Sequence, residues 1–255
     1  NCDFPDKIWE IMGRIDVHSH LLPGVDDGCK DLQESIACAR MLVGAGYSHC
    51  FCTPHIWPSD LKLTVQTVRQ LTHDLQSALD GVGIPLQVVP GSELNLNQYV
   101  MREPADRIIS AALAGKYILV DMWADRLPEW FEPTIRWLQE MQLKVILAHP
   151  ERMRAVQDEP GIVYRFEELG ILLQGNLQCF ADRPDADTRR VAELYASEDR
   201  YFLLGSDTHD SAGLRKRLVG LVNVIELVGD ERVDKLTREN PKLMLVDGED
   251  REDRG

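Results

Sequence analysis

The sequence lacks any apolar run that approaches the length of a membrane-spanning helix. Its opening segment, NCDFPDKIWEIMGR, also lacks the apolar core of a signal peptide. Positive charge is scarce, since 28 Lys and Arg face 42 Asp and Glu and the formal net charge is −14. Because such a surface repels phosphate backbones and anionic lipids, neither nucleic acid nor membrane insertion is expected. We therefore expect a soluble, cytoplasmic protein.

Cysteine is too sparse for a disulfide scaffold. The six cysteines are spread along a chain of 255 residues, which is long enough to bury a hydrophobic core, so reduced thiols are expected. Cys50 and Cys52 form a C-x-C pair on an expected strand, where both side chains face the same side. We interpret this pair as buried packing rather than a metal site, because cysteine is among the most buried residue types. The Walker A and HExxH motifs are also absent.

Short apolar or β-branched runs alternate with helical patterns along the chain. The expected strands are residues 14–18, 48–53, 86–90, 117–122, 144–148, 171–175 and 201–204. Expected helix faces comprise Leu32, Ile36, Ala39 and Val43; Val68, Leu71, Leu75 and Leu79; and Leu214, Leu218, Leu221 and Ile225. Asp31 and Glu34 have the spacing of a capping box at the start of the first helix.

Alternating strands and helices require crossover connections, which place parallel strands inside and helices outside. The pattern predicts an α/β fold whose strands close into a barrel. A single domain is expected over residues 1–246, with residues 1–13 as an N-terminal extension. Residues 247–255, DGEDREDRG, are expected to form a charged, disordered tail because they contain no apolar anchor.

Side chains that bind metals follow almost every expected strand. They are His18, His20, Asp26, Asp27, His55, Glu93, Asp121, His149, Asp207 and His209. Because the carboxyl ends of parallel barrel strands meet on one face, we expect these side chains to lie together. They exceed the four ligands of one tetrahedral zinc ion, which argues for two or three divalent ions bridged by carboxylate. Manganese, iron, zinc and magnesium all remain compatible with these donors.

Other charged side chains have a simpler interpretation. His49 lies within a strand and His73 on a polar helix face, so both are expected to be structural. Asp26 could simply form the turn after the first strand. Arg152 could be a surface ion pair, but its place three residues after His149 suits bidentate binding of an oxyanion.

Five segments in order, DVHSHLLPGVDDG, TPH, GSE, HPER and GSDTH, resemble the PHP (polymerase and histidinol phosphatase) superfamily. Within it the chain looks like the bacterial metal-dependent protein-tyrosine phosphatases of capsular and exopolysaccharide systems, the CpsB/CapC type. The resemblance runs from about Ile15 to Leu245. It implies a distorted TIM-like (βα)7 barrel, a PHP domain with three metal ions at the carboxyl ends of the strands.

The resemblance also implies a role for individual residues. The first ion would be held by His18, His20, Glu93 and Asp207; the second by Glu93, Asp121 and His149; the third by Asp27, His55 and His209. Arg152 matches the phosphate-binding arginine of HPER, and Arg215 is the candidate for a second arginine although its register is about one residue longer. Two departures stand out: Asp121 replaces the usual Glu, and QGNLQCF (174–180) matches its family segment only loosely.

The implied activity is hydrolysis of phosphotyrosine on protein by a hydroxide that bridges metal ions, most plausibly manganese. Arg152 and Arg215 would hold the phosphate, and His55 or His209 would assist the leaving group through water. A tyrosine kinase of polysaccharide assembly is the implied partner. A cysteine-based mechanism is excluded, because no cysteine is followed by arginine in a C-x5-R motif.

Three alternatives remain at this point. The first is a PHP phosphoesterase for a small ester such as histidinol phosphate. The second is a metal hydrolase of the amidohydrolase kind, which also begins with D-x-H-x-H, here Asp16, His18 and His20. The third is a catalytically weak homologue that regulates or scaffolds polysaccharide assembly.

Overall fold

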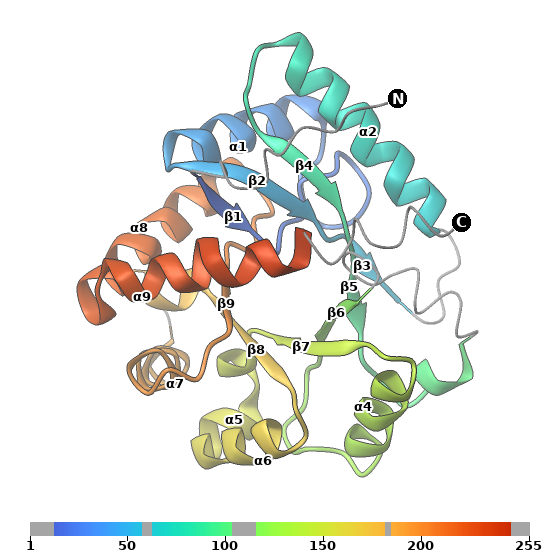
Figure 1. The fold of residues 1–255 in the computed structure, drawn as a ribbon, viewed down its shortest axis with the longest axis vertical. Coiled ribbons are helices and arrows are strands. Elements are labelled where there is room, and N and C mark those ends of the chain that lie inside the picture. Colours follow the sequence, from blue (N-terminus) through green and yellow to red (C-terminus); the bar gives the residue numbers. More distant parts are fainter. Residues whose placement is uncertain (1–12, 58–62, 104–115, 182–184, 246–255) are drawn as a thin grey trace.

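A computed structural model describes residues 13–57, 63–103, 116–181 and 185–245, and Figure 1 shows helices arranged around parallel strands. The strands are β1 (Arg14–Asp16), β2 (Tyr47–Cys52), β3 (His55–Ile56), β4 (Gln87–Pro90), β5 (Glu93–Asn95), β6 (Tyr117–Asp121), β7 (Lys144–Ala148), β8 (Leu172–Asn176) and β9 (Leu203–Gly205). The helices are α1 (Leu32–Gly44), α2 (Val65–Gly81), α4 (Phe131–Glu140), α5 (Arg154–Asp158), α6 (Val163–Glu168), α7 (Ala186–Ser197), α8 (Ser211–Val228) and α9 (Asp230–Asp234).

The strands form two parallel sheets, in the orders β1-β2-β4 and β3-β5-β6-β7-β8-β9. The chain passes from the first sheet to the second twice, from β2 to β3 through Thr53 and Pro54, and from β4 to β5 through Gly91 and Ser92. The seven expected runs coincide with β1, β2, β4, β6, β7, β8 and β9. The short strands β3 and β5 were not anticipated, because proline and glycine interrupt the strand pattern before them.

Backbone hydrogen bonds join the last strand to the first beyond their ends. Ser19 and Thr208 form an isolated parallel bridge. Asp207 N donates to His18 O at 2.7 Å, and His20 N donates to Thr208 O at 2.8 Å. Near the other end of β1, Arg14 contacts Asp234 in α9, which Figure 1 shows crossing the strands. The α/β barrel prediction is therefore confirmed, in a distorted form whose closure depends on loops.

Buried side chains alternate between two hydrophobic clusters. In β6, Tyr117 and Leu119 belong to a small cluster inside the ring of strands, whereas Ile118 and Val120 belong to the larger cluster under the helices. Alternation with a period of two therefore directs Asp121 to the inside. The same alternation places Phe51 inside, and His55 follows it by four positions. The apolar interior thus ends in polar side chains at the carboxyl edge.

The expected helices are present, with shifts in their buried faces. In α1 the fully buried residues are Ser35, Cys38, Ala39 and Leu42, so the face lies about one position from the expected one. Asp31 accepts from Glu34 N at 2.9 Å as a capping residue should. The Glu34 carboxylate accepts from Ser211 N at 2.6 Å, which links α1 to the start of α8 instead of completing a capping box.

Several other expectations have structural counterparts. Cys50 and Cys52 are buried in the larger cluster, and all five described cysteines are free. No helix in the described part of the chain is long and apolar enough to cross a membrane. The expected tail at 247–255 and nearly all of the expected extension at 1–13 lie outside the described residues. The single-domain boundary at 246 therefore stays a prediction.

Candidate metal centre

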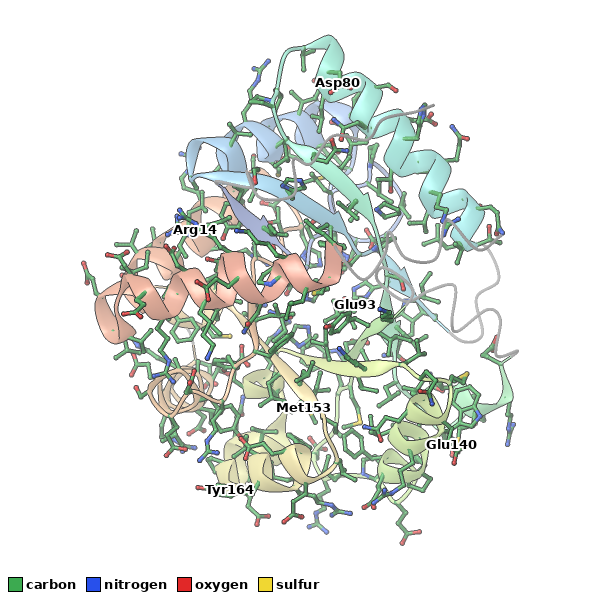
Figure 2. All side chains as sticks on the ribbon, viewed as in Figure 1. Arg14, Asp80, Glu93, Glu140, Met153 and Tyr164 are labelled. Carbon is green, nitrogen blue, oxygen red and sulfur yellow. The ribbon has the colours of Figure 1, made fainter. Side chains whose placement is uncertain are left out.

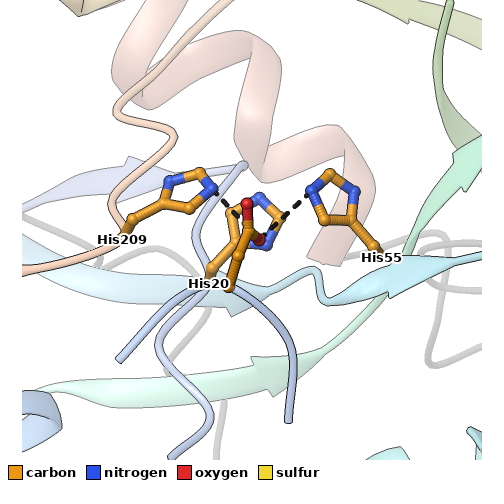
Figure 3. A group of neighbouring side chains, drawn as sticks. His20, His55 and His209 are labelled. Carbon is orange, nitrogen blue, oxygen red and sulfur yellow. Dashed lines mark ion pairs between the residues drawn. The ribbon is translucent and has the colours of Figure 1, made fainter. Parts of the chain in front are cut away.

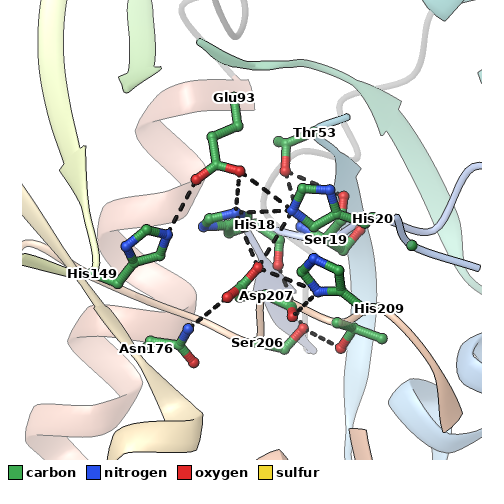
Figure 4. Close-up of polar contacts among 12 residues, drawn as sticks. His18, Ser19, His20, Thr53, Glu93, His149, Asn176, Ser206, Asp207 and His209 are labelled. Carbon is green, nitrogen blue, oxygen red and sulfur yellow. Dashed lines mark hydrogen bonds and ion pairs between the residues drawn. The ribbon is translucent and has the colours of Figure 1, made fainter. Parts of the chain in front are cut away.

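Four buried donor atoms from three strand ends surround one point. Nε2 of His18 lies 3.2 Å from Glu93 Oε2, 3.4 Å from Asp207 Oδ1 and 3.3 Å from Nε2 of His20. Nε2 of His20 lies 3.4 Å from Glu93 Oε2 and 3.3 Å from Asp207 Oδ1. Donors around a tetrahedral ion with bonds of about 2.1 Å lie about 3.4 Å apart. The four atoms, visible in Figure 4, therefore fit the coordination of one divalent cation.

The two histidines are held in the tautomer that metal binding requires. His18 Nδ1 lies 2.8 Å from Gln174 Oε1, and His20 Nδ1 lies 2.7 Å from Asp26 Oδ2. Neither oxygen can donate when Asp26 is ionised, so each Nδ1 carries a proton and each Nε2 can offer its lone pair once a cation displaces the proton there. The pKa of Asp26 supports this, because despite burial its contacts with His20 lower it to about 2. Asp26 is therefore more than a turn residue.

Two buried atoms, one within this group and one beside it, have no hydrogen-bond partner among the described residues. They are His55 Nδ1 and Glu93 Oε2, which lie 3.0 Å apart. Buried polar atoms without partners are costly, unless an ion completes their environment. His55, Glu93 and Asp121 bring one ligand atom each within 4.8 Å of the others, and so do His18, Glu93 and His149. Glu93 therefore belongs to several adjacent donor groups.

A fourth donor group lies nearer the solvent and contains His20, Asp27, His55 and His209. Asp27 Oδ1 lies 3.4 Å from His55 Nε2 and 3.5 Å from His209 Nε2. Figure 3 shows the three histidines of this group close together. His209 Nδ1 lies 2.8 Å from the carbonyl of Asp207, which leaves its Nε2 free to bind an ion. The Asp27 side chain is 68% exposed, so this group is open to solution.

The structure groups Asp121 and His149 differently from the expected second ion site. Asp121 lies with His55 and Glu93, while His149 lies with His18 and Glu93. Asn95 Nδ2 donates to Asp121 Oδ1 at 3.2 Å, and burial together with Glu93 raises the pKa of Asp121 to about 6. The Asp121 carboxylate is thus held by an amide from β5.

Backbone strain accompanies two of the strand-end residues. His149 has φ of 35° and Asp207 has φ of 53°, in the left-handed region that is costly for residues other than glycine. His149 follows β7 and Asp207 follows β9, so the chain turns as the side chain enters the centre. Strain of this kind persists where surrounding structure holds it, and it gathers at functional sites.

Electrostatics within the centre couple histidines to carboxylates. Burial lowers the pKa of His18, but Glu93 and Asp207 outweigh burial and raise it to about 9. Burial raises the pKa values of Glu93 and Asp207, but contacts with the histidines, His18 foremost, hold both well below their usual range. Protons therefore occupy the positions that a divalent cation would take, and a cation would displace them.

Arg152 reaches the centre from the helical turn Pro150–Arg152. Its Nη1 donates to Asp207 Oδ2 at 2.9 Å, and Asn176 Nδ2 donates to the same oxygen at 2.7 Å. The Arg152 guanidinium also lies over the Trp123 ring, with Cζ 4.8 Å from the ring centroid. Arg152 therefore pairs with a buried carboxylate of the donor group rather than with a surface residue.

The second expected arginine is placed differently. Arg215 is exposed on α8. Arg217, two positions later, is buried, and its charge interacts with those of Asp207 and Arg152. Burial lowers the pKa of Arg217, and its Nε has no hydrogen-bond partner among the described residues. The sequence interpretation missed Arg217 because it chose the second arginine by counting residues after His209. The helical period would have indicated Arg217, which lies one turn beyond Leu214 on the buried face of α8.

Other contacts were only partly visible in the sequence. Gln174 and Asn176 alternate at the end of β8, so the loosely matching segment does contribute to the centre. The interpretation of His49 and His73 as structural fits their positions, since neither belongs to a described donor group. Asp16 accepts from Ser206 N at 2.9 Å and also belongs to no described donor group, unlike the rest of the D-x-H-x-H segment.

Comparisons with known proteins agree with this geometry. The chain is 29% identical over 235 residues to the tyrosine-protein phosphatase YwqE of Bacillus subtilis, covering 91% of each chain. A solved structure of the metal-dependent tyrosine phosphatases YwqE from Bacillus subtilis and CpsB from Streptococcus pneumoniae matches with a TM-score of 0.79 and 27% identity, over 91% of this chain and 94% of that one.

A histidinol phosphate phosphatase from Lactococcus lactis shares the fold alone, with a TM-score of 0.51 and 12% identity over 81% of this chain and 92% of that one. The family model for capsular polysaccharide synthesis, CpsB/CapC, matches residues 14–246, from the start of β1 to the end of the last described segment. The donor groups, their neighbouring arginines and this nearly complete match show that the chain belongs to the CpsB/CapC family.

Proposed function

We propose that this protein is a metal-dependent phosphatase that hydrolyses phosphotyrosine on proteins. The observation that carries the proposal is the group of four buried donor atoms at 3.2–3.4 Å, with Arg152 donating to the second oxygen of the Asp207 carboxylate. Family membership and the relatives named tyrosine-protein phosphatase support it. A centre that combines cations with an arginine suits a doubly charged phosphate monoester.

Three divalent ions, proposed to be manganese, occupy the donor groups in this proposal. The first would be held by His18, His20, Glu93 and Asp207, and the third by Asp27, His55 and His209. The second would be held by Glu93 with Asp121 and His149, which each share a described donor group with Glu93 although no one group contains all three. Divalent cations supply Lewis acidity there and lower the pKa of water from about 15.7 toward about 7. Gln174 and Asp26 orient the histidines, which keeps the ligands preorganised.

The phosphate itself is proposed to be bound by arginine. Arg152 is part exposed and already donates from one Nη, so its remaining donors can meet phosphate oxygens. Arg217 takes the place of Arg215 in this proposal, because its guanidinium is buried near Asp207 with an unpaired Nε. These positive charges stabilise the negative charge of the transferring phosphoryl group.

Departure of the tyrosyl oxygen requires little help. A phenol has a pKa of about 10, so tyrosinate leaves more readily than an alkoxide. His55 and His209 stand at the open side of the centre and are proposed to assist by way of water. Burial and neighbouring His20 lower the pKa of His209, which favours its neutral imidazole over the imidazolium.

The proposed physiological substrate is a tyrosine kinase of polysaccharide assembly, in line with the family's description. An assay of phosphotyrosine peptide, histidinol phosphate and an amide substrate, each with added Mn²⁺, tests the proposal. We expect turnover of the phosphotyrosine peptide that EDTA abolishes and Mn²⁺ restores. Selective turnover of histidinol phosphate would show that the substrate is a small phosphate ester. No turnover with any metal would favour a regulatory homologue.

A further inference from the structure

Two exposed tryptophans stand beside the metal centre. Trp57 follows His55 by two residues after β3, and Trp123 follows Asp121 by two residues after β6. Their exposed fractions are 46% and 60%, which is high for the largest apolar side chain. In extended chain, residues two apart point the same way, so each indole is expected one step further toward solvent than a candidate ligand.

Ring contacts confirm that both indoles adjoin the centre. The Trp57 ring centroid lies 6.0 Å from that of His55, and the Trp123 centroid lies 6.2 Å from that of His149. Strands β3 and β6 are the two neighbours of β5 in the sheet, and β5 begins with Glu93. The two indoles therefore stand on either side of the strand that carries the shared carboxylate.

Trp123 is also tied to the phosphate-binding residue. The Arg152 guanidinium lies over the indole at 4.8 Å, a cation–π contact that orients the arginine whose Nη1 reaches Asp207. Much of the indole remains exposed despite this contact. A group attached to a phosphate bound by Arg152 would thus come next to an open aromatic surface.

We propose that Trp57 and Trp123 form an aromatic clamp that binds the phenyl ring of an aryl phosphate monoester, the side chain of phosphotyrosine. This inference rests on the proposed function and adds residues that select the substrate. A phenyl ring stacks on indole through offset or edge contacts, whereas the side chain of phosphoserine or a small alkyl ester offers no such face. Trp123 is the principal member, because Arg152 couples its position to the phosphate.

The test compares the binding of two phosphonates that cannot be hydrolysed. Phenylphosphonate and methylphosphonate share the anionic group and differ in the ring, so the ratio of their Kd values isolates ring recognition. We expect Mn²⁺-loaded protein to prefer phenylphosphonate about tenfold. Trp123→Ala should reduce this preference to less than about threefold, and Trp123→Phe should retain most of it. Trp57→Ala should have a smaller effect in the same direction.

Tyr164 provides a matched control. It is an exposed aromatic residue on α6, it lies under a guanidinium at 4.7 Å in the same way, and Figure 2 shows it at the periphery, away from Glu93. Tyr164→Ala should leave both Kd values unchanged. Manganese content, measured for every variant, should also be unchanged because no tryptophan belongs to a donor group.

The outcomes separate this inference from the proposed function. If Trp123→Ala binds both phosphonates with the preference of the unaltered protein, the aromatic clamp is refuted, whatever the turnover. If both Kd values rise equally, Trp123 acts only by placing Arg152, and ring selection is again refuted. If the preference is lost as expected but no phosphotyrosine peptide is turned over by the unaltered protein, the clamp stands and the proposed function fails.

Discussion

Arg152 donates a hydrogen bond from Nη1 to Oδ2 of Asp207 at 2.9 Å, while Oδ1 of the same carboxylate faces the histidines. One carboxylate thus joins the expected phosphate-binding residue to the expected cation. Asn176 holds the same Oδ2 at 2.7 Å, so the carboxylate keeps a donor when the arginine is removed. The roles of substrate binding and metal binding can therefore be separated by mutation.

Replacing Arg152 with alanine should leave metal content unchanged and lower kcat/KM for phosphotyrosine peptide by about 100-fold, the usual loss for one transition-state donor. Metal analysis and steady-state kinetics on one preparation check both parts. Arg154→Ala is the control, because the ion pairs that Arg154 forms with described residues, Asp158 and Asp187, are exposed. Full activity in Arg152→Ala would show that the guanidinium does not touch the reacting phosphate.

Replacing His149 or Asp207 with alanine should remove metal and activity together. Each contributes a buried ligand atom to a described donor group. Without that atom, too few donors remain to hold the cation. Elemental analysis after dialysis against Mn²⁺ measures the metal per chain. His73→Ala serves as the matched control, because His73 is 75% exposed on α2 and should keep both properties. Normal metal content in His149→Ala would contradict the assignment.

The fold was largely predictable because its longer strands, such as β6, show their period. Tyr117 and Leu119 alternate with Ile118 and Val120, so β6 could be located from its apolar pattern alone. The strands β3 and β5 could not be located, because two or three residues after proline or glycine carry no period. The link from Glu34 to Ser211 also escaped, since it depends on where two distant helices begin.

The candidate metal ligands were predictable where a residue type that binds metals stands at the end of an expected strand. His18, His20 and Glu93 could be recognised because a turn after a strand does not require imidazole or carboxylate side chains, whereas a metal site does. The supporting contacts are different in kind. Gln174 and Asn176 have side chains common on any surface, and only the register of β8 beside β7 and β9 brings them to His18 and Asp207.

Metal binding should strengthen as pH rises. In the metal-free protein the pKa of His18 is raised to about 9, so its proton is bound at pH 7 and a cation must displace it. The apparent Kd for Mn²⁺ should fall up to about tenfold per pH unit from pH 6.5 to 8.5 for each proton displaced. Calorimetry in buffers of different ionisation enthalpy counts the protons released.

The stability of the metal-free protein should change in the opposite direction. Because the folded pKa of His18 is raised, its contribution to stability is complete below the unfolded value of about 6.5 and is lost as pH rises through 9. Tm without metal should therefore decline over this window while Tm with saturating Mn²⁺ should not. A Mn²⁺ affinity that is constant over the window would contradict the coupling of protons and cations.

Arg217 and Arg215 offer a paired test two positions apart on α8. Arg217 is buried and interacts electrostatically with Asp207 and Arg152, whereas Arg215 is exposed, so Arg217 is the better candidate to act on a bound phosphate. Arg217→Lys should lower kcat/KM at least about tenfold, since lysine keeps the charge but loses the planar set of donors. Arg215→Ala should change kcat/KM less than about twofold, as is usual for an exposed side chain. Thermal unfolding of both variants guards against loss of structure, and a larger activity loss in Arg215→Ala would restore the arginine that motif spacing indicated.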